Sequence, residues 1–127
     1  MIYPVFSKDE QKAILHLASA VAFDGDWHEN AKRLLNAIGY RFGFSLQDMG
    51  DSITYSRQKA LSCIKAMSME KKRLATILFM SAAMADGNMR LAKTQWDTFG
   101  DFASQCDLPT NVPFNEALDI THQYLGC

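Results

Sequence analysis

One phrase occurs twice in this 127-residue chain, and it constrains the fold more than any other feature of the sequence. The segment LHLASAVAFDGD, residues 15–26, returns later in the chain as ILFMSAAMADGN, residues 77–88. Each copy is a run of small and apolar residues that ends in an Asp-Gly pair. Apolar residues recur in both runs at helical spacing, and glycine commonly ends a helix. The sequence therefore predicts a helix, a corner and a second helix, present in two copies.

The second helix of each copy aligns best at a slightly larger offset than the first, because the second corner is longer. The paired apolar positions are Leu35 with Phe99, Ile38 with Phe102, Phe42 with Cys106, and Phe44 with Leu108. Repeat 1 then covers about residues 7–45, and repeat 2 covers about residues 69–108. Two copies are too few for a solenoid, so a bundle with internal pseudo-twofold duplication is expected.

Local signals place the remaining helices and predict a single all-α domain of about six to seven helices over residues 1–127. Ser7 and Glu10 form a capping-box pattern, and Ser45 with Asp48 suits the start of a short helix that ends at Gly50. Pro113 suits the first turn of a C-terminal helix at about 113–125. No segment alternates as a strand does. The expected helices cover about residues 7–23, 29–43, 45–50, 54–67, 68–85, 91–106 and 113–125.

Charge and composition exclude several classes of function. A net charge of -1 argues against nucleic acid as a partner, because binding phosphates requires a basic surplus. The one basic run, Lys71-Lys72-Arg73, is typical of a solvated helix start. No apolar stretch reaches the roughly 20 residues that span a bilayer, and the first residues lack the pattern of a secretory signal. We therefore expect a cytoplasmic protein without membrane insertion. Three cysteines at long spacings predict neither a disulfide framework nor a metal knuckle.

The duplicated corners resemble those of the TerB-like tellurite-resistance family. The matching residues are Ala22, Asp24 and Gly25 with Gly43-Phe44 in the first copy, and Ala85, Asp86 and Gly87 with Asp107-Leu108 in the second. The resemblance covers about residues 10–108 and implies a TerB-like helical bundle with a role in stress response. Members of the family carry acidic residues after each Asp-Gly pair. This chain keeps them only after the first corner.

Carboxylates at the corners predict one candidate metal site, formed by Asp24, Asp26, Glu29 and Asp86. The segment after Asp24 is not an EF-hand loop, because Glu29 stands where the loop needs glycine and Leu35 where it needs a bidentate Glu. The simpler interpretation is that Asp26 and Glu29 complement the positive end of the second helix. Weak binding of calcium or another divalent cation is the alternative. No other cofactor is expected.

Trp27 and Met89 follow the two corners, where loop residues are usually polar, and they form a candidate interaction surface. No nucleophile motif or phosphate-binding glycine loop is present, and His16, His28 and His122 are too far apart in sequence to form a local ligand set. The prediction is a non-enzymatic protein-interaction or stress-response module, whose partner is an unknown protein or a second copy of the chain. A weak divalent-cation-binding protein and a small enzyme with a site between the repeats are the two alternatives.

Overall fold

The computed structural model describes residues 6–22, 29–83, 93–109, 115 and 119, and every regular element among them is a helix. The all-α prediction is therefore confirmed for this part of the chain. The helices are α1 (Lys8–Ala22), α2 (Glu29–Arg41), α3 (Leu46–Ile53), α4 (Arg57–Lys65), α5 (Met69–Ala83) and α6 (Lys93–Cys106). Asn115 and Asp119 are also helical, while the rest of the predicted C-terminal helix lies outside the described residues.

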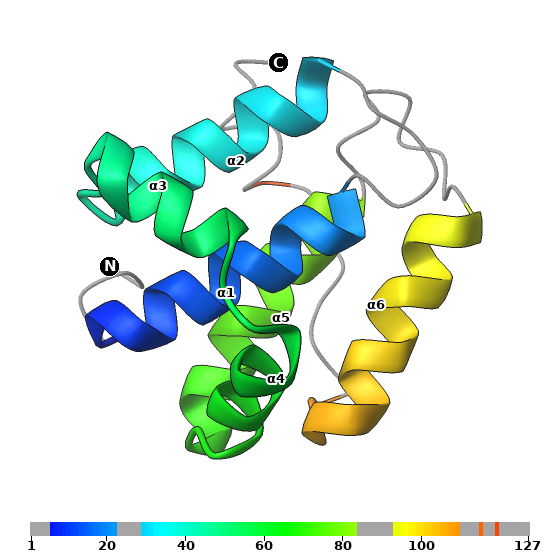
Figure 1. The fold of residues 1–127 in the computed structure, drawn as a ribbon. Coiled ribbons are helices and arrows are strands. Elements are labelled where there is room, and N and C mark those ends of the chain that lie inside the picture. Colours follow the sequence, from blue (N-terminus) through cyan, green and yellow to red (C-terminus); the bar gives the residue numbers. More distant parts are fainter. Residues whose placement is uncertain (1–5, 23–28, 84–92, 110–114, 116–118, 120–127) are drawn as a thin grey trace.

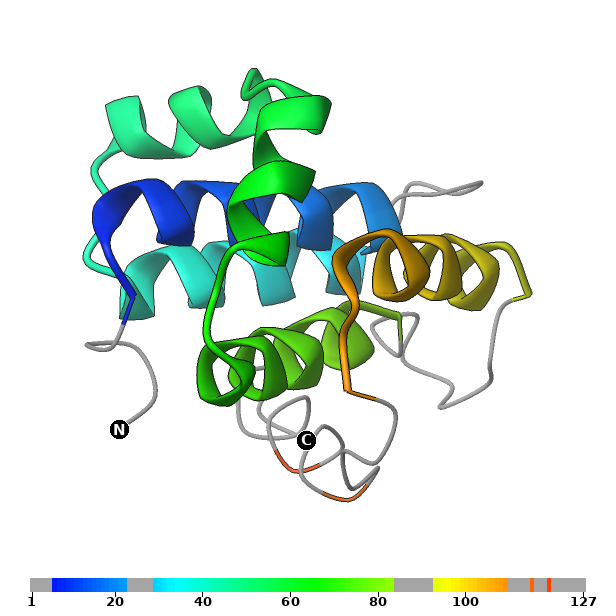
Figure 2. The ribbon, with the colours of Figure 1, turned by 90° about the horizontal axis from the view of Figure 1, so that it is seen from below.

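Helix α1 runs through the middle of the bundle and contacts each of α2 to α6 (Figures 1 and 2). Its buried residues occupy several faces rather than one stripe: Gln11, Ala13, Ile14, Leu15, Leu17, Ala18, Val21 and Ala22. Small side chains among them let neighbouring helices approach closely. A helix that is apolar nearly all round is stable only when other elements surround it, so α1 organises a single domain.

Helix α5 is buried even more completely along its second half. Every residue from Ala75 to Ala83 is buried, including two hydroxyl-bearing side chains. Thr76 Oγ1 donates to the Lys72 carbonyl at 2.6 Å, and Ser81 Oγ donates to the Ile77 carbonyl at 3.0 Å. These bonds within the helix satisfy the hydroxyl groups, so α5 can be surrounded without leaving them unpaired. None of the described helices has the length and apolar character needed to cross a membrane.

The predicted helix starts at Ser7, Ser45 and Ser68 are confirmed. The Ser7 N–H donates to Glu10 Oε1 at 2.7 Å, and the Glu10 N–H donates back to Ser7 Oγ at 3.2 Å. Ser45 and Asp48 form the same reciprocal pair at the start of α3. Ser68 Oγ accepts from the Lys71 N–H at 3.3 Å. The three caps are local hydrogen bonds, which is why residue types alone located them.

Two boundaries near α3 and α4 were predicted wrongly. Helix α3 continues through Gly50 to Ile53, and it ends where Thr54 donates both its N–H and its hydroxyl to the Gly50 carbonyl. An internal glycine costs a helix only about 1 kcal/mol, which the cap and packing outweigh here. Helix α4 begins at Arg57 rather than near residue 54, because Ser56 Oγ caps it by accepting from the Lys59 N–H.

The basic run at residues 71–73 lies near the start of α5, as predicted, but it is not a solvated face. Lys71 Nζ lies 2.9 Å from Glu10 Oε1, so it pairs with the cap of α1. Lys72 is only 8% exposed. Lys71 and Lys72 therefore pack against the bundle, and Glu10 is brought beside Lys71 from a distant part of the chain.

Helices α2 and α6 end in the same backbone turn. Gly43 has φ 76° and Asp107 has φ 55°, both in the left-handed region. The next N–H, of Phe44 or Leu108, donates to the carbonyl five residues earlier, Gly39 or Ala103, at 2.9 Å in both cases. The two turns therefore fall at matching positions when the two sequence copies are aligned on their second helices.

Most of the apolar positions that recur at helical spacing in the sequence are buried. Leu15, Leu35, Ile38, Leu78 and Phe102 belong to the main cluster, and Ile77 forms a second one with Met80. Leu74 and Phe99 are only half-buried, and Phe99 lines an open groove between α5 and α6. The corner glycines and their equivalence lie outside the described residues.

Replacing Phe79 by Ala is expected to lower the free energy of unfolding by about 3–5 kcal/mol, because the ring is fully buried and its loss leaves a cavity. Tyr40→Ala is the control, since that ring is 82% exposed and its loss changes stability by less than about 0.5 kcal/mol. Urea unfolding measures both. Equal effects would mean that Phe79 does not lie in the core.

Gly43→Ala is expected to destabilise the fold by about 1 kcal/mol, because a side chain disfavours positive φ. A Cβ there meets no atom within 4 Å, so the cost is purely conformational. Asp107→Gly, at the matching turn of α6, should instead stabilise the fold, because glycine adopts positive φ without strain. Thermal unfolding checks this pair: the melting temperature should fall by roughly 4 °C in the first variant and rise in the second. Shifts of the same sign would refute a shared turn.

Candidate functional site

An apolar cleft lies between α2 and α3, with α1 as its floor. Its volume is about 270 Å³. Leu15 and Ser19 come from α1, Lys32, Leu35 and Asn36 from α2, and Met49, Ser52 and Ile53 from α3. Because small-molecule pockets usually measure about 300–1,000 Å³, the cleft is better matched to a few inserted side chains than to a metabolite.

The two walls of the cleft meet at Gly39. A Cβ at this position would overlap the sulfur of Met49, so the glycine makes room on α2 for the Met49 side chain of α3. Helix α3 is also held by α1: Lys12 Nζ lies 3.2 Å from Asp51 Oδ2 and 3.7 Å from Asp48 Oδ1. The hydrogen bond to Asp51 raises the pKa of Lys12, so the amine stays charged. These contacts hold α3 in its position relative to α1 and α2, and so define the shape of the cleft.

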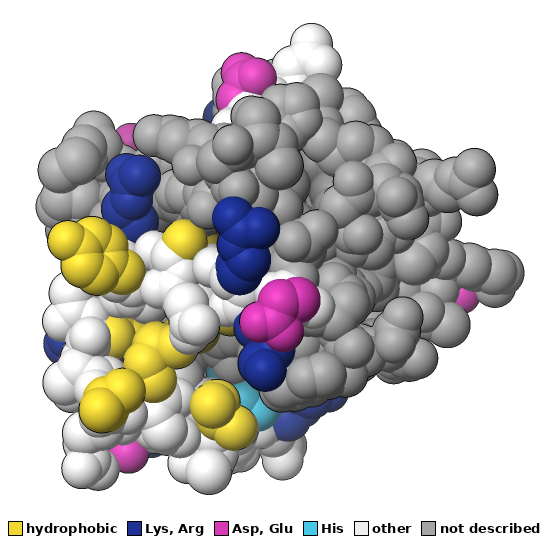
Figure 3. Space-filling model, turned by 90° about the horizontal axis from the view of Figure 1, so that it is seen from above, with side chains coloured by type: hydrophobic (Ala, Val, Ile, Leu, Met, Phe, Trp, Pro, Cys, Tyr) yellow, Lys and Arg dark blue, Asp and Glu magenta, His cyan; other side chains and the backbone are white. Residues whose placement is uncertain are grey.

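Two large apolar side chains are exposed on α3, which forms one wall of the cleft, and one of them, Ile53, lines the cleft itself. Ile53 is 65% exposed and Leu46 is 92% exposed, and they lie two helical turns apart on α3. Figure 3 shows apolar side chains gathered on the face that α2 and α3 form, with lysine and arginine side chains beside them. Contiguous apolar surface with polar residues around it is typical of a contact site for another protein.

His16 holds the C-terminal end of α3 next to the cleft. Its Nδ1 lies 3.0 Å from the Ser52 carbonyl, and Arg57 Nε donates to its Nε2 at 3.2 Å. A carbonyl only accepts and a guanidinium only donates, so these partners require a neutral ring protonated at Nδ1. Burial lowers the pKa of His16; the Ser52 carbonyl partly opposes this, and the Arg57 charge adds to it. His16 therefore acts as a neutral link between α1, α3 and α4.

The described thiols are poor nucleophiles at neutral pH. Burial raises the pKa of both Cys63 and Cys106. Cys106 Sγ also donates to the Leu61 carbonyl at 3.5 Å, which keeps its proton in place. Thiolate, the reactive form, is therefore scarce at both positions.

Most residues of the two predicted sites lie outside the described part of the chain. These are Asp24, Asp26 and Asp86 of the metal site, and Trp27 and Met89 of the interaction surface. Glu29 is described: its side chain is 78% exposed, and its Oε2 lies 3.9 Å from Lys32 Nζ. Among the described residues, no three His, Cys, Asp or Glu side chains gather as metal ligands. The cation site remains a prediction.

The cleft itself was not found by sequence reasoning. Leu46, Met49 and Ile53 follow the spacing of one helical face, and that signal was available. It was missed because the helix was expected to end at Gly50, which left Ile53 in a loop. The pairing of α3 with α2 depends on Gly39 and Met49, whose proximity no local pattern indicates.

Comparison with models of protein families, with curated proteins and with solved structures finds no match to this chain. The resemblance to TerB-like proteins therefore rests on the sequence motifs. The described residues define the class: a helical bundle of one domain, built around a central helix.

Stability should depend on the protonation of His16. Its pKa is lower in the folded chain than the unfolded value of about 6.5, so the unfolded state takes up the proton first as pH falls. The contribution of neutral His16 is complete above about pH 6.5 and decreases below it, down to the folded pKa. Urea unfolding at pH 7.5 and 5.5 measures the loss. His16→Gln, which keeps the other histidines, should lose less stability over this interval; an equal loss would assign the effect elsewhere.

Proposed function

We propose that this chain is a non-enzymatic, TerB-like interaction module of the cytoplasm, and that the α2–α3 cleft binds an apolar segment of another protein. The observation that carries the proposal is the cleft with its exposed rim. An apolar opening of about 270 Å³ has Ile53 in its lining, and Leu46 lies on the same helix; both are large side chains that the fold leaves in solvent. Burying them against a partner would recover about 25 cal/mol per Å² of apolar surface.

The shape of the cleft favours a helical partner. Its walls are two helices in contact at Gly39 and Met49, and its floor is Leu15 on a third helix. Grooves between helices commonly accept an amphipathic helix whose apolar residues recur every three or four positions. One apolar residue of the partner helix would enter the cleft beside Leu35, and the next apolar residue along that helix would pack on Ile53. The partner that fits is therefore an amphipathic helix with two or more large apolar anchors.

The TerB-like assignment and the internal duplication form part of the same proposal. The repeated Asp-Gly phrases support it, and so do the identical turns after α2 and α6 at Gly43 and Asp107. Under this proposal α1–α2 and α5–α6 are related hairpins, with α3 and α4 as the connection. A role in stress response follows from the family resemblance.

Site-specific photo-crosslinking in the native cytoplasm tests this function. A benzophenone amino acid at position 53, on the cleft rim, should give a discrete adduct with one protein. The matched control is position 69, since Met69 is also exposed and apolar but lies at the start of α5, away from the cleft. With the purified partner, Ile53→Asp should weaken binding at least tenfold, about 1.4 kcal/mol, while Met69→Asp leaves it unchanged.

Other outcomes would redirect or refute the proposal. An adduct between two copies would identify the partner as a second copy of this chain. Adducts of equal yield from positions 53 and 69, or none from position 53, would remove the cleft as the contact surface. An Ile53→Asp protein that binds its partner normally would do the same.

A further inference from the structure

A polar pocket lies between α1, α4 and α6, three helices that contact one another in the bundle (Figures 1 and 2). Its volume is about 560 Å³, which is within the range of about 300–1,000 Å³ that is usual for small-molecule sites. One cation, one anion, three neutral hydrogen-bonding side chains and an aromatic ring contribute to its lining. They are Ser19 of α1, Arg57 of α4, and Thr98, Asp101, Phe102 and Gln105 of α6.

Two contacts hold the guanidinium group of Arg57 in place. Its Nε donates to His16 Nε2 at 3.2 Å, and its Cζ lies 5.4 Å from the centroid of the Phe102 ring. Phe102 is buried, so this ring is a fixed support. Neither contact uses the terminal nitrogens, and no carboxylate of the described residues pairs with Arg57. A fixed planar fork of N–H groups suits two-point binding of a carboxylate.

Asp101 supplies the opposite charge in the same pocket. Among the residues that the structure describes, it too has no ion-pair partner, so Arg57 and Asp101 line one opening without neutralising each other. A carboxylate only accepts hydrogen bonds, and an ammonium group only donates them. The two charges are therefore complementary to a molecule that carries both a carboxylate and an ammonium group.

The neutral side chains of the lining indicate what else such a molecule would carry. The Ser19 hydroxyl and the Gln105 amide each offer both a donor and an acceptor. They suit a polar, uncharged group better than an apolar one, because an apolar group would leave them without partners.

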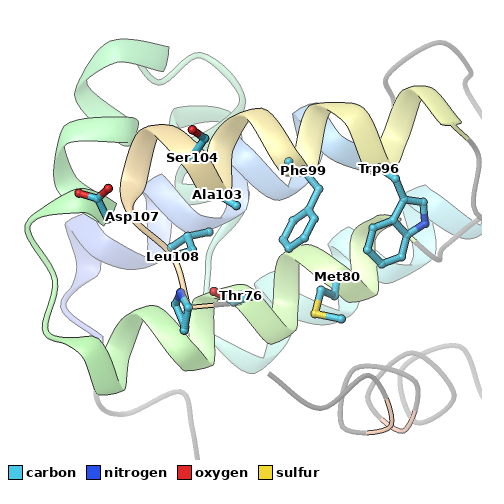
Figure 4. A pocket seen from close by; sticks show the side chains of 10 residues that line it. Thr76, Met80, Trp96, Phe99, Ala103, Ser104, Asp107 and Leu108 are labelled. Atoms are coloured by element: carbon cyan, nitrogen blue, oxygen red, sulfur yellow. The ribbon is translucent and has the colours of Figure 1, made fainter. Parts of the chain in front are cut away.

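The groove between α5 and α6 offers no such set of groups, although it is larger, at about 700 Å³. The Ser104 hydroxyl and the Asp107 carboxylate point away from the space between these helices, where Met80 and the rings of Trp96 and Phe99 lie (Figure 4). Small-molecule sites depend on a few polar groups directed at the ligand. The pocket beside Arg57 is therefore the better site for a polar small molecule.

We propose that the pocket between α1, α4 and α6 binds a free amino acid with a polar, uncharged side chain. Arg57 binds its carboxylate, Asp101 binds its ammonium group, and Ser19 and Gln105 contact its side chain. Both charged residues are exposed, and exposed ion pairs are weak, so the expected dissociation constant is in the millimolar range. Ser19 also lines the α2–α3 cleft, but binding in the pocket requires no partner in that cleft.

Titration of the isotope-labelled full-length chain with L-glutamine, followed through its amide chemical shifts, tests this site. The shifts should concentrate at the residues that line the pocket. N-acetyl-L-glutamine lacks the ammonium group and L-glutaminamide lacks the carboxylate. Each should therefore bind about fivefold more weakly than L-glutamine, because one ion pair is lost.

Two pairs of variants identify the residues that bind the charges. Arg57→Gln should weaken L-glutamine binding about fivefold. Lys59→Gln is its control, because it removes the same charge from α4 at a residue outside the pocket lining. Asp101→Asn should have a similar effect, and Asp97→Asn, an exposed position of α6 outside the lining, should have none.

The amide spectrum also shows whether each variant remains folded. If Arg57→Gln unfolds the chain, Arg57→Lys replaces it, since it keeps the charge but loses the planar fork. Equal affinity for L-glutamine and its two blocked derivatives would overturn the assignment, as would equal effects at positions 57 and 59. An absence of shifts at the pocket with tens of millimolar L-glutamine would also overturn it.

Discussion

The burial of α1 is the constraint on which the rest of the structure depends. Its apolar residues occupy too many faces for one neighbour to cover, and the five other described helices all contact it. Ala13, Ala18 and Ala22 are fully buried, so the helices around α1 can approach its backbone closely. A large residue at these positions would separate the helices, because a close-packed interior has little room for added volume. The bundle is therefore arranged around α1, and the positions of the two apolar openings follow from how the outer helices pack on it.

Polar side chains along α1 determine how the outer helices are placed. Glu10 receives the Ser7 N–H and the Lys71 ammonium, which joins the starts of α1 and α5. Burial alone would raise the pKa of Glu10, but these partners outweigh it and lower the pKa. One turn apart along the helix, Lys12 and His16 contact α3, at Asp51 and at the Ser52 carbonyl. Both ion pairs are partly buried, and each can form in only one register of the helix that it joins to α1.

No described segment covers two large apolar side chains of α3, Ile53 in the lining of the α2–α3 cleft and Leu46 two turns before it. They are 65% and 92% exposed. Exposed apolar surface of this kind is a candidate for contact with another protein.

The sequence by itself determined the helical class, the serine caps and most of the core, because these depend on residues that are close neighbours along the chain. Ser7 and Ser45 were located by capping patterns, Ser68 as the expected start of a helix, and Leu15, Ile38 and Phe102 by helical periodicity. Only the tertiary structure decided that Lys72 is buried, that Phe99 borders a groove, and that Gly39 admits Met49. The location of the α2–α3 cleft also depends on the tertiary structure. Each of these facts depends on which helices become neighbours, and that choice is made by the packing of the whole bundle around α1 rather than by any local pattern of residues.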